Sequence, residues 1–207
     1  ISCQIATPIT AISLSAQMME EHPSRDYLAQ IHKQLGRLTH LEEALLLLSR
    51  LDAGILPLKM EAVDVYTAVS LAADNLQEVF EAAGLSVDIS EMGEMKILAD
   101  LDWTMEALMN LFKNCAEYTP PGGRIHCACS QNPLYTEIIL WDEGKGFDKE
   151  DIPHLFERFY RGKNASGNGI GIGLSLAREI IERQNGTIRA VNLPGKGAAF
   201  EIRFYSH

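Results

Sequence analysis

Residues 110–120 read NLFKNCAEYTP, residues 142–146 read DEGKG and residues 167–174 read GNGIGIGL, and these three stretches decide the fold. In the first stretch, Asn110 and Asn114 are four residues apart on a predicted helix, so their amides share one face. An amide oxygen is a neutral ligand that suits magnesium. Two asparagines at this spacing are also typical of a solvated helix face, so the first stretch alone only suggests a metal ligand.

The second stretch directly follows an apolar run that predicts a strand. At the end of a buried strand, Asp142 can accept a hydrogen bond from an exocyclic amine, and Gly144 and Gly146 let a ring approach the backbone. Aspartate and glycine are also the usual residues of a hairpin turn, which is the plainer interpretation of this pentapeptide by itself.

The third stretch carries alternating glycines at the start of a predicted helix, where backbone amides are available to an anion. No strand precedes these glycines, so they are not a dinucleotide-binding fingerprint. The GxxxxGK pattern of a P-loop is absent as well. The sequence therefore excludes the Rossmann and P-loop nucleotide sites.

Taken together, the order and spacing of the three stretches resemble the ATP-binding domain shared by histidine kinases, Hsp90-type chaperones, gyrases and MutL-type repair proteins. The resemblance covers residues 60–207, and the stretches look like the N box, the G1 box and the G2 box of that domain. Residues 152–161, IPHLFERFYR, are similar to the F box, an element of histidine kinases that chaperones and gyrases do not share. The resemblance thus narrows to the histidine kinases.

The resemblance implies ATP and Mg²⁺ as cofactors. By this resemblance Asn114 is the magnesium ligand, Tyr118 packs near the adenine, and Asp142 binds the adenine amino group. It assigns nucleotide binding to these further residues as well: Asn110, Gly144, Gly146, Arg161, Gly167, Gly169, Gly171, Gly173 and Leu174.

Arg158, in the F box, is a candidate catalytic residue. A guanidinium near the terminal phosphate neutralises charge that builds up as a phosphoryl group leaves, although a surface ion pair is the simpler role. Two positions depart from the family pattern. Glu117 stands where the N box usually has a phosphate-binding lysine, and Ala198 stands where a threonine usually supports the adenine-binding aspartate. Both departures put the strength of nucleotide binding in question.

Ahead of these motifs, apolar residues recur at steps of three and four over residues 5–21 and residues 28–51, which predicts two helices. Pro23 disfavours helix at the preceding residue, and Ser24 can cap a new N-terminus, so the two helices form a tight hairpin. Two helices bury too little apolar surface alone, so we expect a homodimeric four-helix bundle. The alternative is that they cover another part of the same chain.

Gly54 and Pro57 end the second helix, and we place the domain boundary there, between residues 1–56 and residues 57–207. Beyond it the pattern predicts an α+β domain, an α/β sandwich with helices on one face of a mixed sheet. The expected helices are residues 66–83, residues 102–118 and a segment after Gly171; the expected strands are residues 85–89, 96–100, 124–130, 137–141, 187–191 and 199–205.

Residues 2–10, SCQIATPIT, closely resemble the H box of the family, and Cys3 aligns with its phosphoacceptor histidine. The chemistry needs a neutral imidazole nucleophile, whereas an unperturbed thiol is only slightly ionised at pH 7. Gln4 can orient a neighbour but cannot act as a base. Thr7 lies on the same helical face and, by resemblance, positions water for dephosphorylating a partner. Cys3 is therefore an engineered substitution, a natural degenerate kinase or a working cysteine acceptor, the last being least favoured.

Bulk composition is that of a soluble globular chain. Of 207 residues, 46% are apolar and 22% charged, and the formal net charge of −10 would repel a phosphate backbone, so we expect no nucleic-acid partner. Four cysteines without CxxC spacing suggest a reducing compartment and no zinc site. No apolar run approaches the roughly 20 residues of a membrane helix, and the chain reads as a fragment, so membrane attachment would come only through segments outside it.

The sequence thus predicts the cytoplasmic core of a sensor histidine kinase that binds ATP and Mg²⁺, dimerises, and signals to the receiver domain of a response regulator by phosphotransfer. A non-catalytic nucleotide-binding scaffold is the alternative, because Cys3, Glu117 and Ala198 all depart from the family pattern. An anti-sigma-type serine kinase on the same fold is a third, which the helical hairpin and the F box oppose.

Overall fold

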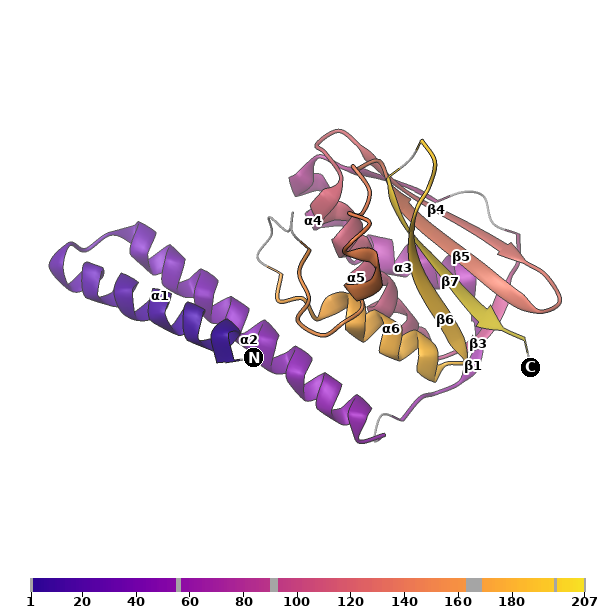
Figure 1. Cartoon of the computed structure of the whole chain (residues 1–207), viewed down its shortest axis with the longest axis horizontal. Helices are drawn as coiled ribbons and strands as arrows, with labels where there is room; N and C mark the ends of the chain where they lie inside the picture. Colours follow the sequence, from indigo (N-terminus) through magenta and orange to yellow (C-terminus); the bar gives the residue numbers. More distant parts are fainter. Residues whose placement is uncertain (1, 55–56, 90–92, 163–168, 196, 207) are drawn as a thin grey trace. The chain divides into compact units, whose positions relative to one another are not determined.

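The structure is a computed structural model (Figure 1). It describes the following residues: 2–54, 57–89, 93–162, 169–195 and 197–206, with the backbone alone for 2–4, 40, 51 and 52. The chain divides into two compact units, residues 1–56 and residues 57–207. Each unit has its own packed elements.

The first unit is a hairpin of two helices, α1 (Ser2–Glu21) and α2 (Arg25–Asp52), which pack against each other. The Oγ of Ser24 accepts a hydrogen bond from the backbone N–H of Asp26 at 3.1 Å, in agreement with the predicted cap. Across the hairpin, the Ser15 hydroxyl donates to Gln30 Oε1 at 3.2 Å. None of the helices within the described ranges combines the length and the apolarity that a membrane crossing requires.

The second unit is built on a five-stranded sheet in the order β2-β4-β5-β7-β6. The β2–β4 pair is parallel and the other pairs are antiparallel, so the sheet is mixed. A small antiparallel sheet pairs β1 with β3. The strands are β1 (Glu61–Asp64), β2 (Ser86–Ile89), β3 (Lys96–Ala99), β4 (Arg124–Gln131), β5 (Tyr135–Asp142), β6 (Gly186–Asn192) and β7 (Ala198–Tyr205).

Helices cover one face of this sheet (Figure 1). They are α3 (Val65–Asp74), α4 (Gln77–Ala83), α5 (Leu101–Tyr118) and α6 (Gly173–Arg183), with a short 3₁₀ turn, η1 (Ile152–His154). The predicted architecture, a helical hairpin followed by an α/β sandwich with a mixed sheet, is therefore confirmed.

The alternation of β5 determines where its last residue lies. Ile138, Leu140 and Asp142 are buried at every second position, while the residues between them are half-buried. Because side chains alternate across a strand, Asp142 lies on the same face as the apolar core. When Ile138 and Leu140 of β5 pack into the core, the alternation of the strand places the Asp142 carboxylate in the interior as well.

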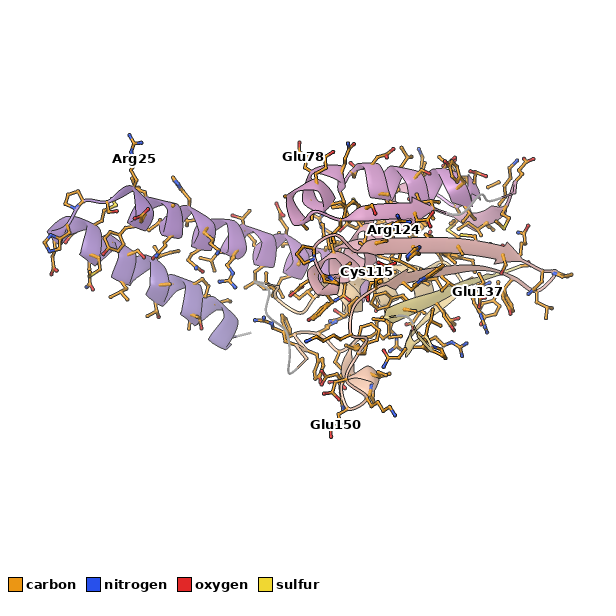
Figure 2. All side chains as sticks on the ribbon, turned by 90° about the horizontal axis from the view of Figure 1, so that it is seen from above. Arg25, Glu78, Cys115, Arg124, Glu137 and Glu150 are labelled. Atoms are coloured by element: carbon orange, nitrogen blue, oxygen red, sulfur yellow. The ribbon has the colours of Figure 1, made fainter. Side chains whose placement is uncertain are left out.

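The interior between helices and sheet also contains thiols. Cys115 on α5 is fully buried, whereas Glu78 and Glu150 project outward (Figure 2). The described cysteines Cys115, Cys127 and Cys129 are free, and burial raises the pKa of the Cys115 thiol well above its usual value. A thiol that is buried and protonated is a packing residue rather than a reactive one.

One expectation for local structure was wrong, and one strand was missed. The helix predicted over residues 66–83 is two helices, because Asn75 ends α3 and its side-chain amide donates to the carbonyl of Leu71 at 2.8 Å. Strand β1 was not predicted, since its four residues, EAVD, carry too short a pattern to show alternation.

A buried glutamine, Gln184, connects the end of α6 to the start of α5. Gln184 follows α6, is 1% exposed, and its Oε1 accepts from the backbone N–H of Asp100 at 2.6 Å and from the Thr104 hydroxyl at 3.3 Å. Asp100 is itself the N-cap of α5, where its carboxylate accepts from the backbone N–H of Trp103. The start of α5 is thereby fastened to the end of α6.

Replacing Gln184 by leucine should destabilise the second unit by about 1–3 kcal/mol, because the backbone N–H of Asp100 is left buried without an acceptor. Urea unfolding followed by circular dichroism measures this. Gln77→Leu is the control, since the Gln77 side chain is exposed and bonds Glu81 on its own helix. It should change stability by less than about 0.5 kcal/mol. Equal effects of the two substitutions would contradict the bracing role.

Candidate functional site

A cavity of about 660 Å³ opens in the second unit between the end of α5, the loop after β5, the segment around η1 and the start of β7. Its size falls within the range of small-molecule sites. The wall carries four carboxylates and one lysine: Glu117, Glu143, Asp148, Asp151 and Lys145. The excess of carboxylates repels an anion that has no bound cation. An anionic ligand would therefore enter more easily as a complex with a metal cation.

Asp142 does not line the cavity itself, although its neighbours Glu143, Gly144 and Ala198 do. Its two carboxylate oxygens differ in their hydrogen bonds. Its Oδ1 accepts from the backbone N–H of Gly144 at 2.7 Å and from that of Ala198 at 3.1 Å. Its Oδ2 is buried and has no partner within the described ranges. Burial raises the pKa of this carboxyl, and the two N–H donors oppose that rise. The arrangement presents a fixed acceptor, suited to a donor on a ligand.

Two glycines make this geometry possible. A Cβ at Gly144 would lie 2.5 Å from the backbone oxygen of Tyr118, and a Cβ at Gly197 would overlap Asp142. Gly197 also donates its backbone N–H to the carbonyl of Asp142 at 2.9 Å. Glycine is therefore required at both positions by close approach of the backbone.

The two asparagines of α5 lie in different environments. Asn114 lines the cavity, and its Oδ1 is buried without a partner in the part of the chain that the structure describes. Asn110 does not line the cavity: its amide nitrogen donates to the carbonyl and the carboxylate of Glu106, and its oxygen lies against Gly173. Asn114 thus offers a free ligand oxygen, whereas Asn110 packs α5 against α6.

Tyr118, at the end of α5, lines the cavity and is partly exposed. Burial raises the pKa of its hydroxyl, and the neighbouring Glu117 adds to the rise, while Arg161 lowers it. The charge of Arg161 is therefore close enough to stabilise the ionised form of Tyr118. Gly146, on the loop after β5, also lines the cavity.

The segment around η1 is tied to the glycine-rich stretch. Phe159 has a φ of 68° and donates its backbone N–H to the carbonyl of Gly171 at 2.7 Å. The hydroxyl of Tyr160 donates to Asp151 Oδ1 at 2.7 Å, which raises the pKa of Tyr160 to about 12. Arg158 and Arg161 are both exposed on this segment.

The glycine-rich stretch leads into α6. No side chain within the described ranges caps the first turn of this helix, which leaves backbone N–H groups available to an anion. Gly171, Gly173 and Leu174 lie at this turn, and a Cβ at Gly169 would be 3.9 Å from Glu117 Oε2. None of these four residues lines the cavity itself. Gly167 lies outside the described residues.

Cys3, Gln4 and Thr7 belong to α1, in the first unit. The side chains of Cys3 and Gln4 lie outside the described residues, and Thr7 is exposed.

Sequence reasoning missed Asn192, which holds the loop after β5 in place. Its Oδ1 accepts from the backbone N–H of Phe147 at 2.7 Å, and its amide nitrogen donates to the carbonyl of Phe147 at 2.8 Å. The two residues are separated by 45 positions, so no local pattern connects them. Phe147 also packs edge-on against Phe200, at 5.4 Å between ring centroids.

The chain matches two family models. Residues 99–206 match "Histidine kinase-, DNA gyrase B-, and HSP90-like ATPase", and residues 1–54 match "His Kinase A (phospho-acceptor) domain". Among curated proteins, the chain is 30% identical to the sensor protein SphS of Synechococcus elongatus over 97% of its length and 52% of SphS. It is 32% identical to the swarming motility regulation sensor protein RssA of Serratia marcescens, over 96% and 44%. The chain thus spans about half the length of these relatives.

Solved structures share the fold. The Acinetobacter baumannii histidine kinase AdeS superposes with a TM-score of 0.81 at 23% identity, covering 98% of this chain and 96% of AdeS. The histidine kinase ThkA, in a complex with the response regulator protein TrrA, superposes with a TM-score of 0.78 at 19% identity, covering 100% of this chain and 60% of ThkA.

By the match over residues 99–206, the second unit belongs to the histidine kinase-, gyrase B- and HSP90-like ATPases. Since the hairpin also matches the phosphoacceptor domain, the chain belongs to the sensor histidine kinases of two-component systems.

Asn192→Ala should free the loop that carries Gly144 and Gly146. Without the Asn192 amide, the backbone N–H of Phe147 loses its acceptor, and its hydrogen exchange should become about 5- to 10-fold faster, equivalent to about 1 kcal/mol. Exchange measured by NMR tests this. Asn132→Ala is the control, because Asn132 caps the β4–β5 turn; unchanged exchange at Phe147 in Asn192→Ala would contradict the loop-holding role.

Proposed function

We propose that this chain binds ATP with Mg²⁺ and forms the cytoplasmic core of a sensor histidine kinase. The observation that carries the proposal is a pair of buried oxygens without partners among the described residues: Asp142 Oδ2, whose neighbours Glu143, Gly144 and Ala198 line the cavity, and Oδ1 of Asn114, which lines it directly. One is an acceptor aimed at an amine and the other is a ligand for a hard cation. The Asp142 oxygen suits the adenine amine, and the Asn114 oxygen suits the magnesium ion bound to the phosphates of the same ATP molecule.

On the base side, Asp142 accepts a hydrogen bond from the exocyclic amine of adenine. The backbone N–H of Ala198 already holds Asp142 Oδ1. This bond comes from the main chain, so alanine at that position keeps it and lacks only the hydroxyl that a threonine would add. Tyr118 packs beside the base, and Gly144 and Gly146 allow it to approach the loop.

On the phosphate side, ATP supplies the phosphoryl group to be transferred. Among the described residues no group of three or more His, Cys, Asp or Glu side chains is placed to hold a metal ion. Magnesium would therefore take Asn114 Oδ1, with phosphate oxygens and water completing its coordination. Because Glu117 and three other carboxylates line the cavity, bound magnesium also offsets their repulsion of the phosphates.

The segment that follows η1 is proposed to supply cationic groups for the phosphates, since Arg158 and Arg161 are exposed on it. Gly169, Gly171, Gly173 and Leu174 are proposed to bind phosphate near the start of α6, which no described side chain caps. Gly167, which lies outside the described residues, is proposed to join them by resemblance alone. Arg158 is proposed to neutralise charge as the phosphoryl group leaves. Asn110 contributes indirectly, by packing α5 against Gly173.

We further propose that the hairpin forms a homodimeric four-helix bundle. Ile9, Leu14, Leu28 and Leu35 are each between 43% and 59% exposed, although apolar. A second copy of the hairpin would cover such residues, in the manner of helix bundles. The bundle is also the proposed contact for the receiver domain of a response regulator, a proposal supported by the fold shared with ThkA, whose structure was solved in complex with the response regulator protein TrrA.

The phosphoacceptor position is where the chain departs furthest from a working kinase. Cys3 occupies it, Gln4 follows, and Thr7 is the residue proposed to position water for dephosphorylation. Cys3 supports a second candidate function, a nucleotide-binding scaffold that signals by conformation alone. Glu117 supports the same candidate, because a carboxylate there weakens phosphate attraction.

Asp142→Asn should weaken ATP binding about 30- to 100-fold. An asparagine that keeps its oxygen on the N–H groups of Gly144 and Ala198 turns its own NH₂ toward the adenine amine, so two donors face each other and about 2–3 kcal/mol is lost. Calorimetry with ATP and magnesium measures the change. Asp148→Asn, on the same cavity wall, is the matched control and should alter affinity by less than about threefold. Unchanged ATP affinity in Asp142→Asn would contradict the proposal that Asp142 binds the adenine amine.

Phosphotransfer should be absent in this chain and appear in Cys3→His, because an imidazole nitrogen is nucleophilic at neutral pH whereas a protonated thiol is not. Incubation with magnesium and labelled ATP measures the transfer, with Cys3→Ala as the matched control. No transfer in Cys3→His, while calorimetry still detects ATP binding, would favour the scaffold over the kinase.

A further inference from the structure

Glu117 is the carboxylate of the cavity wall that lies on α5. It follows Asn114 by three residues, and both residues line the cavity. Side chains three apart on a helix are neighbours, so the Glu117 carboxylate and the Asn114 amide share one face of α5. The Oδ1 of Asn114 is buried and has no partner within the described ranges. An unpartnered amide oxygen with a carboxylate beside it offers two oxygen ligands to a hard cation.

The carboxylate of Glu117 also lies close to the glycine-rich stretch. Its Oε2 is 3.9 Å from the position that a Cβ at Gly169 would take. Gly169 is one of the residues proposed to bind phosphate. Glu117 is therefore near both the proposed magnesium ligand and the proposed phosphate-binding stretch.

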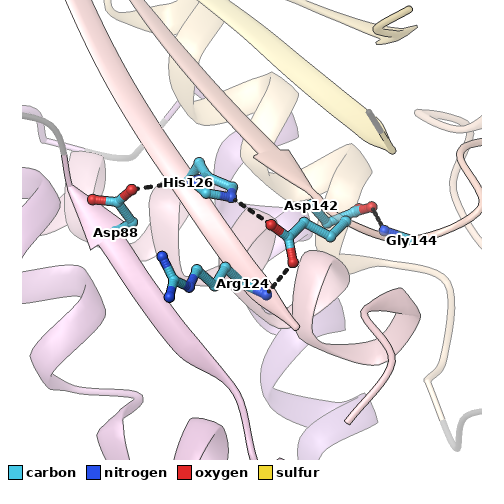
Figure 3. Close-up of polar contacts among 6 residues, drawn as sticks. Asp88, Arg124, His126, Asp142 and Gly144 are labelled. Atoms are coloured by element: carbon cyan, nitrogen blue, oxygen red, sulfur yellow. Dashed lines mark hydrogen bonds and ion pairs between the residues drawn. The ribbon is translucent and has the colours of Figure 1, made fainter. Parts of the chain in front are cut away.

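A second carboxylate of the cavity wall, Glu143, already has partners for both of its oxygens (Figure 3). Its Oε1 lies 3.1 Å from Nε2 of His126, and its Oε2 accepts from the backbone N–H of Arg124 at 3.0 Å. Nδ1 of the same imidazole lies 3.2 Å from Asp88 Oδ2 on β2. Glu143 is thus held by groups on β4 and is not available to a ligand in the cavity.

The two aspartates of the wall have partners as well. Oδ1 of Asp148 accepts from the backbone N–H of Glu150 at 3.3 Å, and Oδ1 of Asp151 accepts from the hydroxyl of Tyr160 at 2.7 Å. Glu117, in contrast, is exposed and makes no hydrogen bond or ion pair within the part of the chain that the structure describes. Of the four carboxylates, Glu117 is therefore the one whose oxygens are open to a cation.

A carboxylate at position 117 changes what the site attracts. The lysine that the family pattern usually has at this position attracts phosphates directly, whereas Glu117 repels them and attracts the cation that they carry. Magnesium is commonly held by one or two carboxylates together with substrate phosphates and water. Glu117 and Asn114, on one turn of α5, match this kind of ligand set.

We propose that Glu117 is a second protein ligand of the magnesium ion, beside Asn114, and that the chain therefore selects the magnesium complex of ATP against the free nucleotide. This inference rests on the proposed ATP site and specifies the form of ATP that the site accepts. Nucleotide affinity then depends more steeply on magnesium than it would with a neutral or cationic residue at position 117.

The test measures the Kd of the full chain for ATP by calorimetry, once with excess magnesium and once with EDTA. In Glu117→Gln, binding should weaken about 10-fold with magnesium, because a ligand of the ion is lost. Binding without metal should strengthen about 2- to 5-fold, because a charge that repels the phosphates is removed. If Glu117 only repels phosphates, binding strengthens under both conditions, and that result would overturn the inference.

Two further variants separate metal binding from a general effect of charge. Glu117→Lys should bind ATP without metal more tightly than either Glu117→Gln or the unsubstituted chain, and should gain least from magnesium. Asp148→Asn removes the same charge from another part of the wall, and should leave the ratio of the two Kd values within about threefold of the unsubstituted chain. An equal loss of magnesium dependence in Asp148→Asn and Glu117→Gln would contradict a specific role for Glu117.

The contact with the metal can also be observed by NMR, with ¹³C in the glutamate carboxyl groups. The Glu117 resonance, assigned by its absence in Glu117→Gln, should differ between saturating ATP with magnesium and saturating ATP with EDTA. The Glu143 resonance, whose oxygens already have partners, should differ less. Identical Glu117 resonances under the two conditions would exclude it as a ligand while leaving the ATP site in place. Absence of ATP binding in every variant, with and without metal, would instead overturn the proposed ATP site and the metal ligand with it.

Discussion

The second unit depends on a carboxylate that is held by the main chain. Asp142 Oδ1 accepts two backbone N–H groups, from Gly144 on its own loop and from Ala198 at the start of β7. Fixing one oxygen in this way leaves the other pointing where no described group reaches it. A side chain at Gly144 or Gly197 would come too close to this carboxylate, so both positions have to be glycine.

Much of the site was predictable because its signals are local. The two-residue period of β5 indicates that a residue after an apolar strand faces the core, and the spacing of Asn110 and Asn114 puts both on one helical face. What the spacing cannot distinguish is their environment: Asn110 is bonded to Glu106, whereas the oxygen of Asn114 has no partner among the described residues. The spacing of the two asparagines does not show that Glu106, one turn before Asn110 on the same helix, takes up the amide of Asn110.

Contacts between distant segments were not predictable. The pairing of Asn192 with Phe147, and the bridge from Asp88 through His126 to Glu143, each require the order of strands in the sheet, and that order joins β2 to β4 in parallel across an intervening helix. The break between α3 and α4 has a related cause. The side-chain amide of Asn75 ends α3. The apolar spacing typical of a helix nevertheless continues beyond Asn75, so the sequence pattern does not show the break.

The backbone N–H of Phe159 donates to the carbonyl of Gly171, which joins the segment after η1 to the start of α6 through the main chain alone. The side chain of Phe159 takes no part in this bond. The contact is therefore indifferent to the type of side chain at position 159, with the exception of proline, which has no N–H to donate. Where the segment that carries Arg158 lies against the start of α6 is thus set by backbone geometry and not by side-chain recognition.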